Sequence, residues 1–270
     1  MGRHAGKEMM LGDIRSAYPL STSEKTTCAA RYGVQEDEIA IANTRHHGHW
    51  YVARILVEAV EKAILQISHF PMPGPLQIAG HLQIRFKFRV GNEAELVPQI
   101  SADFDDGARP LQRIKLSDLV YSSEAVFAEG DQSYSLVRGF QNRFGLAHRI
   151  VSIADRQRTM TDAQGNPRWV EQAEIRISPA LAERLLLNCA LAGRRDGLSR
   201  MYHTLRASCA TEAMARIDET VAYGLLNEVG RRLNETSIPV SGFRYLRARG
   251  LLGPKLPSLN TEFPWPGAKR

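Results

Sequence analysis

The chain has 270 residues, 43% of them hydrophobic, which is enough for one large domain with a sizeable core. Its 35 Lys and Arg residues against 29 Asp and Glu residues give a formal charge of +6 and a pI near 9.4. Because acidic residues are interspersed among the basic ones, this charge indicates an ordinary solvated surface rather than a nucleic-acid-binding arm. Nucleic acid is therefore not the partner that the composition favours.

No apolar stretch approaches the ~20 residues that span a bilayer, and the first residues lack the apolar core of a secretory signal. These features predict a soluble protein without a transmembrane span, either cytoplasmic or exported by a route that needs no such signal. The three cysteines, Cys28, Cys189 and Cys209, cannot all pair and lack the spacing of a zinc or CxxC redox motif. We expect at least one free thiol, no metal and no other cofactor.

The first half of the chain predicts one strand, one helix and one hairpin. After a polar extension over residues 1–35, the alternation at 38–42 predicts a strand, and apolar spacing of three and four over 50–67 predicts an amphipathic helix. A proline-rich loop follows. Alternating residues 82–90, the Gly91-Asn92 turn signal and residues 95–104 then predict a hairpin in which Arg89 faces Glu95.

In the second half, residues 133–137 favour a strand, and residues 149–158 and 169–177 favour a second hairpin. Ser178-Pro179 supplies an N-cap and an N1 proline for one helix, and Ser208 caps another. Residues 236–270 are rich in Pro and Gly and are expected to lie over the core. The pattern predicts an α+β domain over 36–235 between the two extensions.

Cys209 is the first candidate for chemistry because it falls in the first turn of the helix that Ser208 caps. Free backbone N–H groups and the positive end of the helix dipole favour a thiolate, which is the nucleophilic form. The same N–H groups could stabilise an acyl oxyanion. The alternative is a small apolar cysteine packed beneath the helix, because free cysteine is among the most buried residue types.

His81 is the favoured base for such a nucleophile, since it opens the first strand of the predicted hairpin after a stiff loop. In the predicted register Asp103 lies directly across from it and could orient the imidazole. The alternative is a surface histidine at a strand end. His46-His47-Gly48-His49 resembles a metal-binding tract, but a solvated loop is the favoured interpretation because no matching ligand cluster follows it.

Five short stretches follow one another in a consistent order within residues 38–252: Ala42-Asn43-Thr44-Arg45, Ala79-Gly80-His81, Ser101-Ala102-Asp103, Tyr202 to Cys209, and Tyr245 to Leu252. This succession resembles the NVRN, AH, SxExR, YxxxxxNC and YLxxxGLL motifs of the bacterial Lnb N-terminal periplasmic domain family, which is related to permuted papain-like NlpC/P60 folds. The resemblance implies Cys209 as nucleophile, His81 as base and Asp103 as third member, with Tyr202 near the site. Ser208 stands where the family has Asn before the cysteine.

These observations together predict an α+β, permuted papain-like (NlpC/P60-like) core in which helices pack on an antiparallel sheet. The predicted function is a cysteine-dependent acyl transferase or hydrolase that works through a thioester on an ester or amide. Its expected partner is an acyl- or peptide-bearing substrate, which the resemblance extends to a lipid or lipoprotein. Two alternatives are an effector that cleaves peptide or peptidoglycan amides with the same site, and a non-enzymatic binding module on a degenerate papain-like fold.

Overall fold

The computed structural model describes residues 15–25, 32–70, 80–99, 112–126, 136–161, 167–197, 199–223 and 239–265. Its strands are β1 Tyr18–Pro19, β2 Glu38–His46, β3 His49–Leu56, β4 Val60–His69, β5 Gly80–Phe88, β6 Ala94–Pro98, β7 Ile114–Leu116, β8 Asp118–Val126, β9 Phe144–Ser152, β10 Val170–Ile175, β11 Met201–Tyr202 and β12 Leu252–Leu256. The helices are α2 Leu136–Phe140, α3 Ile153–Thr159, α4 Pro179–Asp196, α5 Cys209–Thr220, α7 Gly242–Ala248 and α8 Leu259–Glu262, with a 3₁₀ turn η1 at Pro239–Ser241.

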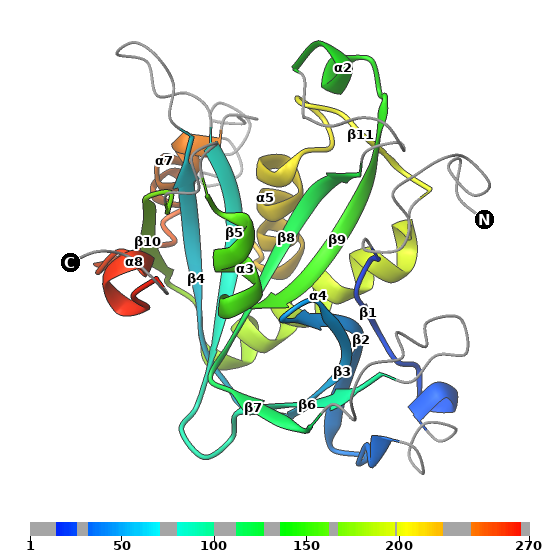
Figure 1. Cartoon of the computed structure of the whole chain (residues 1–270). Helices are drawn as coiled ribbons and strands as arrows, with labels where there is room; N and C mark the ends of the chain where they lie inside the picture. The colour runs from blue at the N-terminus through cyan, green and yellow to red at the C-terminus, as the bar shows by residue number, and fades with distance from the viewer. Residues whose placement is uncertain are drawn as a thin grey trace.

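Within the described residues the strands form one 12-stranded, mostly antiparallel sheet in the order β12-β10-β4-β5-β8-β9-β2-β3-β6-β7, with β1 paired to β2 and β11 to β9. The pairing of β2 with β9 is parallel. Figure 1 shows α3 and α8 on the near side of this sheet and α5 behind it. The protein is therefore an α+β structure with helices on both faces of an open sheet.

The alternation along β5 shows how the two faces differ. Leu82 and Ile84 belong to the main hydrophobic core together with residues of α4, α5 and α7. Side chains of the intervening residues point to the opposite face, where Gln83 accepts a hydrogen bond from Arg156 of α3 and Arg85 is paired with Glu262 of α8. One face is thus apolar and covered by the longer helices, whereas the other carries a buried polar network.

The predicted helix over 50–67 is wrong, because this segment forms β3 and β4. Strand residues here are buried on both faces, so the apolar residues form a nearly continuous run that also fits helical spacing. The turn between the strands contains no Gly, Pro, Asn or Asp, and Glu58 takes the positive φ of 68° that such a turn requires. Nothing in the local sequence marks this reversal of the chain.

Both predicted hairpins are wrong in their pairing. The turn at Gly91 exists, but β5 lies between β4 and β8, and β6 lies between β3 and β7. Glu95 consequently faces Arg54 of β3 rather than Arg89. In the second case, Ser152 ends β9 and caps α3 by accepting a hydrogen bond from Asp155 N–H, while β10 pairs with β4 and β12.

Other expectations are confirmed. Residues 38–42 lie in β2, residues 170–175 of the expected second strand form β10, and Ser178 and Ser208 cap α4 and α5. The expected strand at 133–137 is wrong at its end, where α2 begins at Leu136, and 133–135 lie outside the described residues. Toward the chain ends, β1 and β12 join the sheet, and Ala17, Tyr245 and Leu251 belong to the main core.

Candidate functional site

Cys209 is the first residue of α5, and a capping box fixes its position. Ser208 Oγ accepts a hydrogen bond from Thr211 N–H at 3.4 Å, and Thr211 Oγ1 accepts one from Ser208 N–H at 2.8 Å. This reciprocal pair satisfies two N–H groups that would otherwise have no partner in the first turn. Cys209 itself is only 5% exposed. The sequence prediction of a cysteine in the first turn of a capped helix is therefore confirmed.

The thiol of Cys209 lies where β5 and β8 separate. The pairing of these strands ends at Ile84↔Tyr121. Beyond that point the backbone of Leu82, in β5, hydrogen-bonds the Cys209 sulfur, and the backbone of Ala210 also contributes. Figure 1 shows α5 behind these two strands. The sulfur thus lies against backbone groups near the start of β5 and at the start of α5.

Burial raises the pKa of the Cys209 thiol, although the Leu82 backbone, Arg156 and the Ala210 backbone each act in the opposite direction. Desolvation disfavours the charged thiolate more than the helix start and the guanidinium favour it. The helix start lowers this pKa through the Ala210 backbone, as expected, but burial outweighs it and the net shift is upward. Cys209 rests as a neutral thiol, so its chemistry requires a base that removes the proton during attack.

His81 lies in β5 opposite Ser68 of β4. Its Nε2 atom is buried and has no hydrogen-bond partner among the described residues. Burial, together with the charge of Arg156, lowers the pKa of His81 to about 3. The imidazole is therefore neutral at physiological pH. A neutral, unpartnered ring nitrogen is what a general base must offer.

Arg156 and Glu124 connect the surroundings of Cys209 with those of His81. The positive charge of Arg156 lowers the pKa of both the Cys209 thiol and the His81 ring, and the negative charge of Glu124 raises both. Arg156 comes from α3 on the polar face of the sheet and donates to Gln83 Oε1 at 2.6 Å, two residues after His81. The nucleophile and base predicted from the sequence therefore share one set of charged neighbours.

Asp103, the predicted third member, lies outside the described residues. The argument that placed it opposite His81 is wrong, because it rested on a β5–β6 hairpin and Ser68 of β4 occupies that position. The carboxylate whose charge raises the pKa of His81 is that of Glu124 in β8.

Glu124 is held in its ionised form. It accepts hydrogen bonds from Ser122 Oγ at 2.8 Å, from Arg156 at 2.5 Å and from Arg149 at 3.2 Å. Although burial opposes ionisation, these two guanidinium groups hold the pKa of Glu124 well below its ordinary value. A signal for this residue exists in the sequence, because Ser122-Ser123-Glu124 repeats the Ser-x-acid spacing of Ser101-Ala102-Asp103.

Tyr202 and Ser208 have mainly structural contacts. Tyr202 lies in β11, pairs with Phe144 of β9 and packs in a small apolar cluster with Leu146 and Ala207. The hydroxyl of Ser208 is engaged in the cap of α5. Cys189, the other described cysteine, is fully buried in the main core, and burial raises its pKa well above the ordinary value. It is therefore a packing residue.

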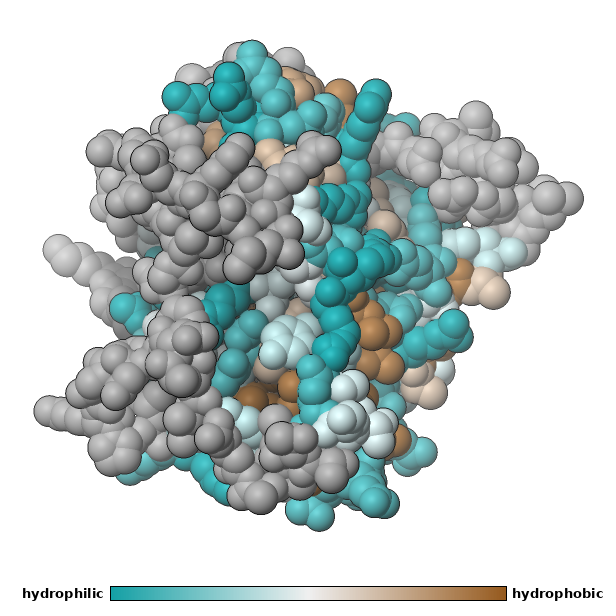
Figure 2. All heavy atoms as spheres, turned by 90° about the vertical axis from the view of Figure 1, so that its right-hand side faces the viewer, coloured by the Kyte–Doolittle hydropathy of each residue, from teal (hydrophilic) through white to brown (hydrophobic). Residues whose placement is uncertain are grey.

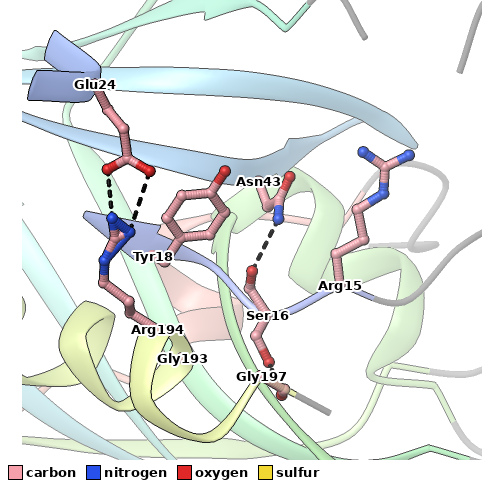
Figure 3. A pocket seen from close by; sticks show the side chains of 8 residues that line it. All are labelled: Arg15, Ser16, Tyr18, Glu24, Asn43, Gly193, Arg194 and Gly197. Atoms are coloured by element: carbon pink, nitrogen blue, oxygen red, sulfur yellow. Dashed lines mark hydrogen bonds and ion pairs between the residues drawn. The ribbon is translucent and has the colours of Figure 1, made fainter. Parts of the chain in front are cut away.

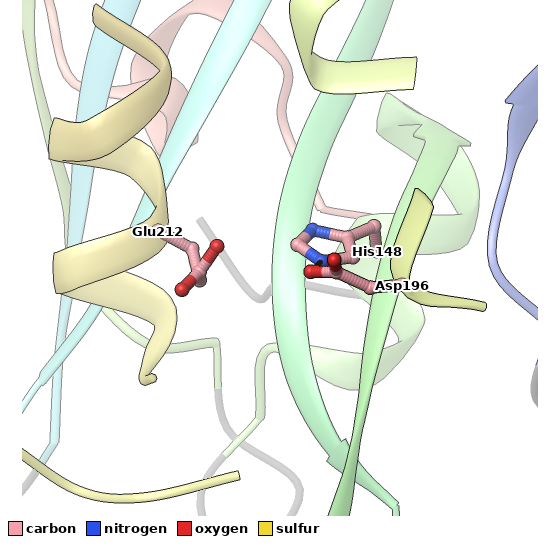
Figure 4. A group of neighbouring side chains, drawn as sticks. All are labelled: His148, Asp196 and Glu212. Atoms are coloured by element: carbon pink, nitrogen blue, oxygen red, sulfur yellow. Dashed lines mark hydrogen bonds and ion pairs between the residues drawn. The ribbon is translucent and has the colours of Figure 1, made fainter. Parts of the chain in front are cut away.

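A second polar cluster, His148, Asp196 and Glu212, is buried between β9, α4 and α5 (Figure 4). Its composition would suit a metal ion, but guanidinium groups occupy the positions of a cation. Arg200 contacts Asp196 at 3.2 Å and Glu212 at 2.8 Å, and His148 Nε2 is hydrogen-bonded to Asp196 at 2.9 Å. The donor set therefore fits an ion-pair network better than a metal site.

The His46-His47-Gly48-His49 tract forms the turn between β2 and β3, where His47 and Gly48 adopt positive φ angles and His46 pairs with His49. His46 Nδ1 is hydrogen-bonded to Ser152 at 2.8 Å, and burial lowers its pKa to about 4. A pocket of about 410 Å³ lies elsewhere, between β1, β2 and the end of α4 (Figure 3). Glu24 and Arg194, which form an ion pair, are part of its wall, and none of the predicted site residues lines it.

Comparisons of this protein with models of known families, with curated proteins and with solved structures give no match. In the part of the chain that the structure describes, no helix is long and apolar enough to cross a membrane.

Proposed function

We propose that this protein is a cysteine-dependent acyl transferase or hydrolase that acts through a thioester on an ester or amide substrate. The observation that carries the proposal is the position of Cys209 at the start of α5, beside the Leu82 backbone and within the influence of the two charged groups that also act on His81. A cysteine at the start of a helix that packs on a histidine-bearing strand is the arrangement of the papain-like, Lnb-type fold that the sequence resembles, and here α5 packs on β5.

The reaction follows from the protonation states. Neutral His81 accepts the thiol proton as Cys209 Sγ bonds to the carbonyl carbon, and the carbonyl oxygen becomes an oxyanion. We assign the stabilisation of that charge to the backbone N–H groups of Leu82 and Ala210, which lie at the sulfur. The carboxylate of Glu124 stabilises the imidazolium, which then gives its proton to the leaving alcohol or amine. Water or an amine resolves the thioester, with His81 again accepting a proton.

Acylation by a small activated ester tests this scheme. We expect incubation with p-nitrophenyl acetate to add one acetyl group to Cys209, identified by peptide mass mapping and removed by neutral hydroxylamine. Cys209→Ala should abolish the adduct, and His81→Gln should slow its formation about 100-fold or more, because a general base contributes roughly 10²–10⁴ in rate. Cys189→Ala serves as the matched control and should acylate like the wild type. Equal acylation of the wild type and His81→Gln would refute the Cys–His pair.

One observation favours a non-enzymatic binding module instead. Cys209 is only 5% exposed, and burial raises the pKa of its thiol, as in a packing cysteine. If this alternative holds, neither Cys209 nor Cys189 acquires an adduct. An amide-cleaving effector would use the same thioester chemistry. Cleavage of peptide amides by the wild type, but not by Cys209→Ala, would select it.

A further inference from the structure

Two segments that are distant in sequence meet at the end of the molecule where α5 begins. Residues 138–143, in α2 and the turn after it, lie against residues 203–206, which join β11 to α5; we call them together the basic tip. Thr204 N–H donates to the Gly139 carbonyl at 3.3 Å, and the rings of Phe140 and His203 meet edge to face with centroids 6.1 Å apart. Figure 1 shows α2 and β11 projecting at the top. The basic tip is therefore one structural unit.

The exposed side chains of the basic tip are of two kinds. Phe140 is 46% exposed and Leu205 is 52% exposed, so two large apolar side chains meet solvent. Arg138, Arg143 and Arg206 are exposed beside them. No Asp or Glu occurs in the described residues 136–145 and 199–207. Figure 2 shows hydrophilic and hydrophobic residues side by side at this end of the molecule. The basic tip thus combines positive charge with exposed apolar area.

We propose that the basic tip docks the protein on the surface of a lipid bilayer that contains anionic lipids. Anionic headgroups attract the arginines, and the acyl boundary below them accepts Phe140 and Leu205. A protein partner is disfavoured by size, since a standard interface takes about 20–30 residues from each side and the basic tip offers far fewer. Nucleic-acid phosphates would satisfy the arginines and leave the apolar side chains in water.

Docking in this way orients the rest of the molecule. His203 N–H donates to the Ala207 carbonyl at 3.0 Å, and Ser208 and Cys209 follow directly. The start of α5 therefore lies at the end of the molecule that faces the membrane. Bilayer binding itself does not use the thiol, so it is independent of the proposed enzymatic function, and Cys209→Ala should bind like the wild type.

Vesicle co-sedimentation of the full chain tests the proposal, with phosphatidylcholine vesicles that contain or lack phosphatidylglycerol. We expect binding only to the anionic vesicles, and weaker binding as salt is raised. Leu205→Ser should weaken partition about tenfold through lost apolar burial. Arg206→Gln should weaken it about fivefold, the equivalent of ~1 kcal/mol for each basic residue at such a surface.

The chain offers a matched control at the opposite end of β5, where Arg89 and Val90 repeat the pairing of an exposed arginine with an exposed apolar residue. Arg89→Gln and Val90→Ser should bind like the wild type, and thermal melting should show all variants folded. The proposal is overturned if no vesicle binds, if control and tip variants weaken binding equally, or if Leu205→Ser changes nothing while heparin competes fully, which would indicate a general polyanion site.

Discussion

The pKa values of Cys209 and His81 decide how the candidate site could work. Many reactive cysteines rest as thiolates beside a protonated histidine, but burial here favours the uncharged form of each group. Proton transfer must then accompany attack, and the developing imidazolium needs a nearby negative charge. Glu124 supplies it, although Arg149 and Arg156 already share its carboxylate. The site therefore depends on a balance among buried charges as well as on the nucleophile.

Glu124→Gln tests this balance. We expect it to slow acetylation of Cys209 about 10- to 100-fold, because an electrostatic stabiliser of the imidazolium is removed, an effect of the order seen when one preorganised group is lost. Glu95→Gln is the matched control, since Glu95 is also a strand carboxylate, paired with Arg54 at 2.8 Å and remote from the thiol in the sheet order. Acetylation rates that fall equally in both variants would show a general loss of stability instead.

At the scale of elements, local signals predicted some features and long-range pairing decided the others. Ser178-Pro179 and Ser208 predicted the starts of α4 and α5 because capping is settled within four residues. Gly91-Asn92 likewise predicted the turn between β5 and β6. However, β5 pairs with β4 and β8, and β6 pairs with β3 and β7, and no local sequence signal specifies these partners. Cys209 and His81 could therefore be proposed from local sequence alone, whereas Glu124 could be chosen over Asp103 only once β8 was known to lie beside β5.

The two capping serines permit a comparison within one molecule. Ser208→Ala and Ser178→Ala each remove an N-cap and should lower the free energy of unfolding by about 1 kcal/mol, measured by urea denaturation. Only Ser208→Ala should also slow acetylation, because the capping box holds the turn that carries Cys209. If Ser178→Ala slows the reaction equally, the capping box does not position the nucleophile.

Helix α4 depends on a close approach to the backbone before β1. A Cβ atom on Gly193 would lie 1.8 Å from the Ala17 carbonyl oxygen, which cannot move as a side-chain tip can. We expect Gly193→Ala to lower the free energy of unfolding by roughly 1–3 kcal/mol through overpacking. Leu191→Ala, on the exposed face of the same helix, should change it by less than about 0.5 kcal/mol, because surface substitutions seldom change stability much. Equal effects in urea denaturation would contradict this close contact.

Across the whole molecule, buried polar groups join segments from distant parts of the chain. Arg85 of β5 is 1% exposed and contacts Asp118 of β8 and Glu262 of α8, each at 2.7 Å, so the C-terminal helix is held to the middle of the sheet. Hydrogen bonding and charge from Arg85 lower the pKa of Glu262. Stability from this carboxylate is present above its unfolded-state pKa and is lost as pH falls through the folded value.

Two histidines of lowered pKa should weaken the fold at milder acidity than the carboxylates do. The pKa of His81 is lowered to about 3 and that of His46 to about 4, both mainly by burial, against 6.5 for a free side chain. Below pH 6.5 these two histidines are protonated in the unfolded chain but not in the folded chain, so the free energy of unfolding falls as the pH drops. Between pH 7.5 and 5 the loss is up to ~2 kcal/mol for each histidine.

His81→Gln isolates one of these contributions. Urea denaturation at pH 7.5, 6 and 5 should show a smaller loss of stability in the variant than in the wild type, with a difference approaching ~2 kcal/mol over this range. His46→Gln should reduce the loss of stability by a similar amount, because it removes a second imidazole of lowered pKa. His46 lies in β2, between β9 and β3, and is therefore several strands away from His81 in β5. The carboxylates remain ionised in the unfolded chain over most of this range and change the slope little. Identical slopes for wild type and His81→Gln would mean that the ring is hydrated in the folded protein, and His81 would then lack the buried, neutral state on which its role as base depends.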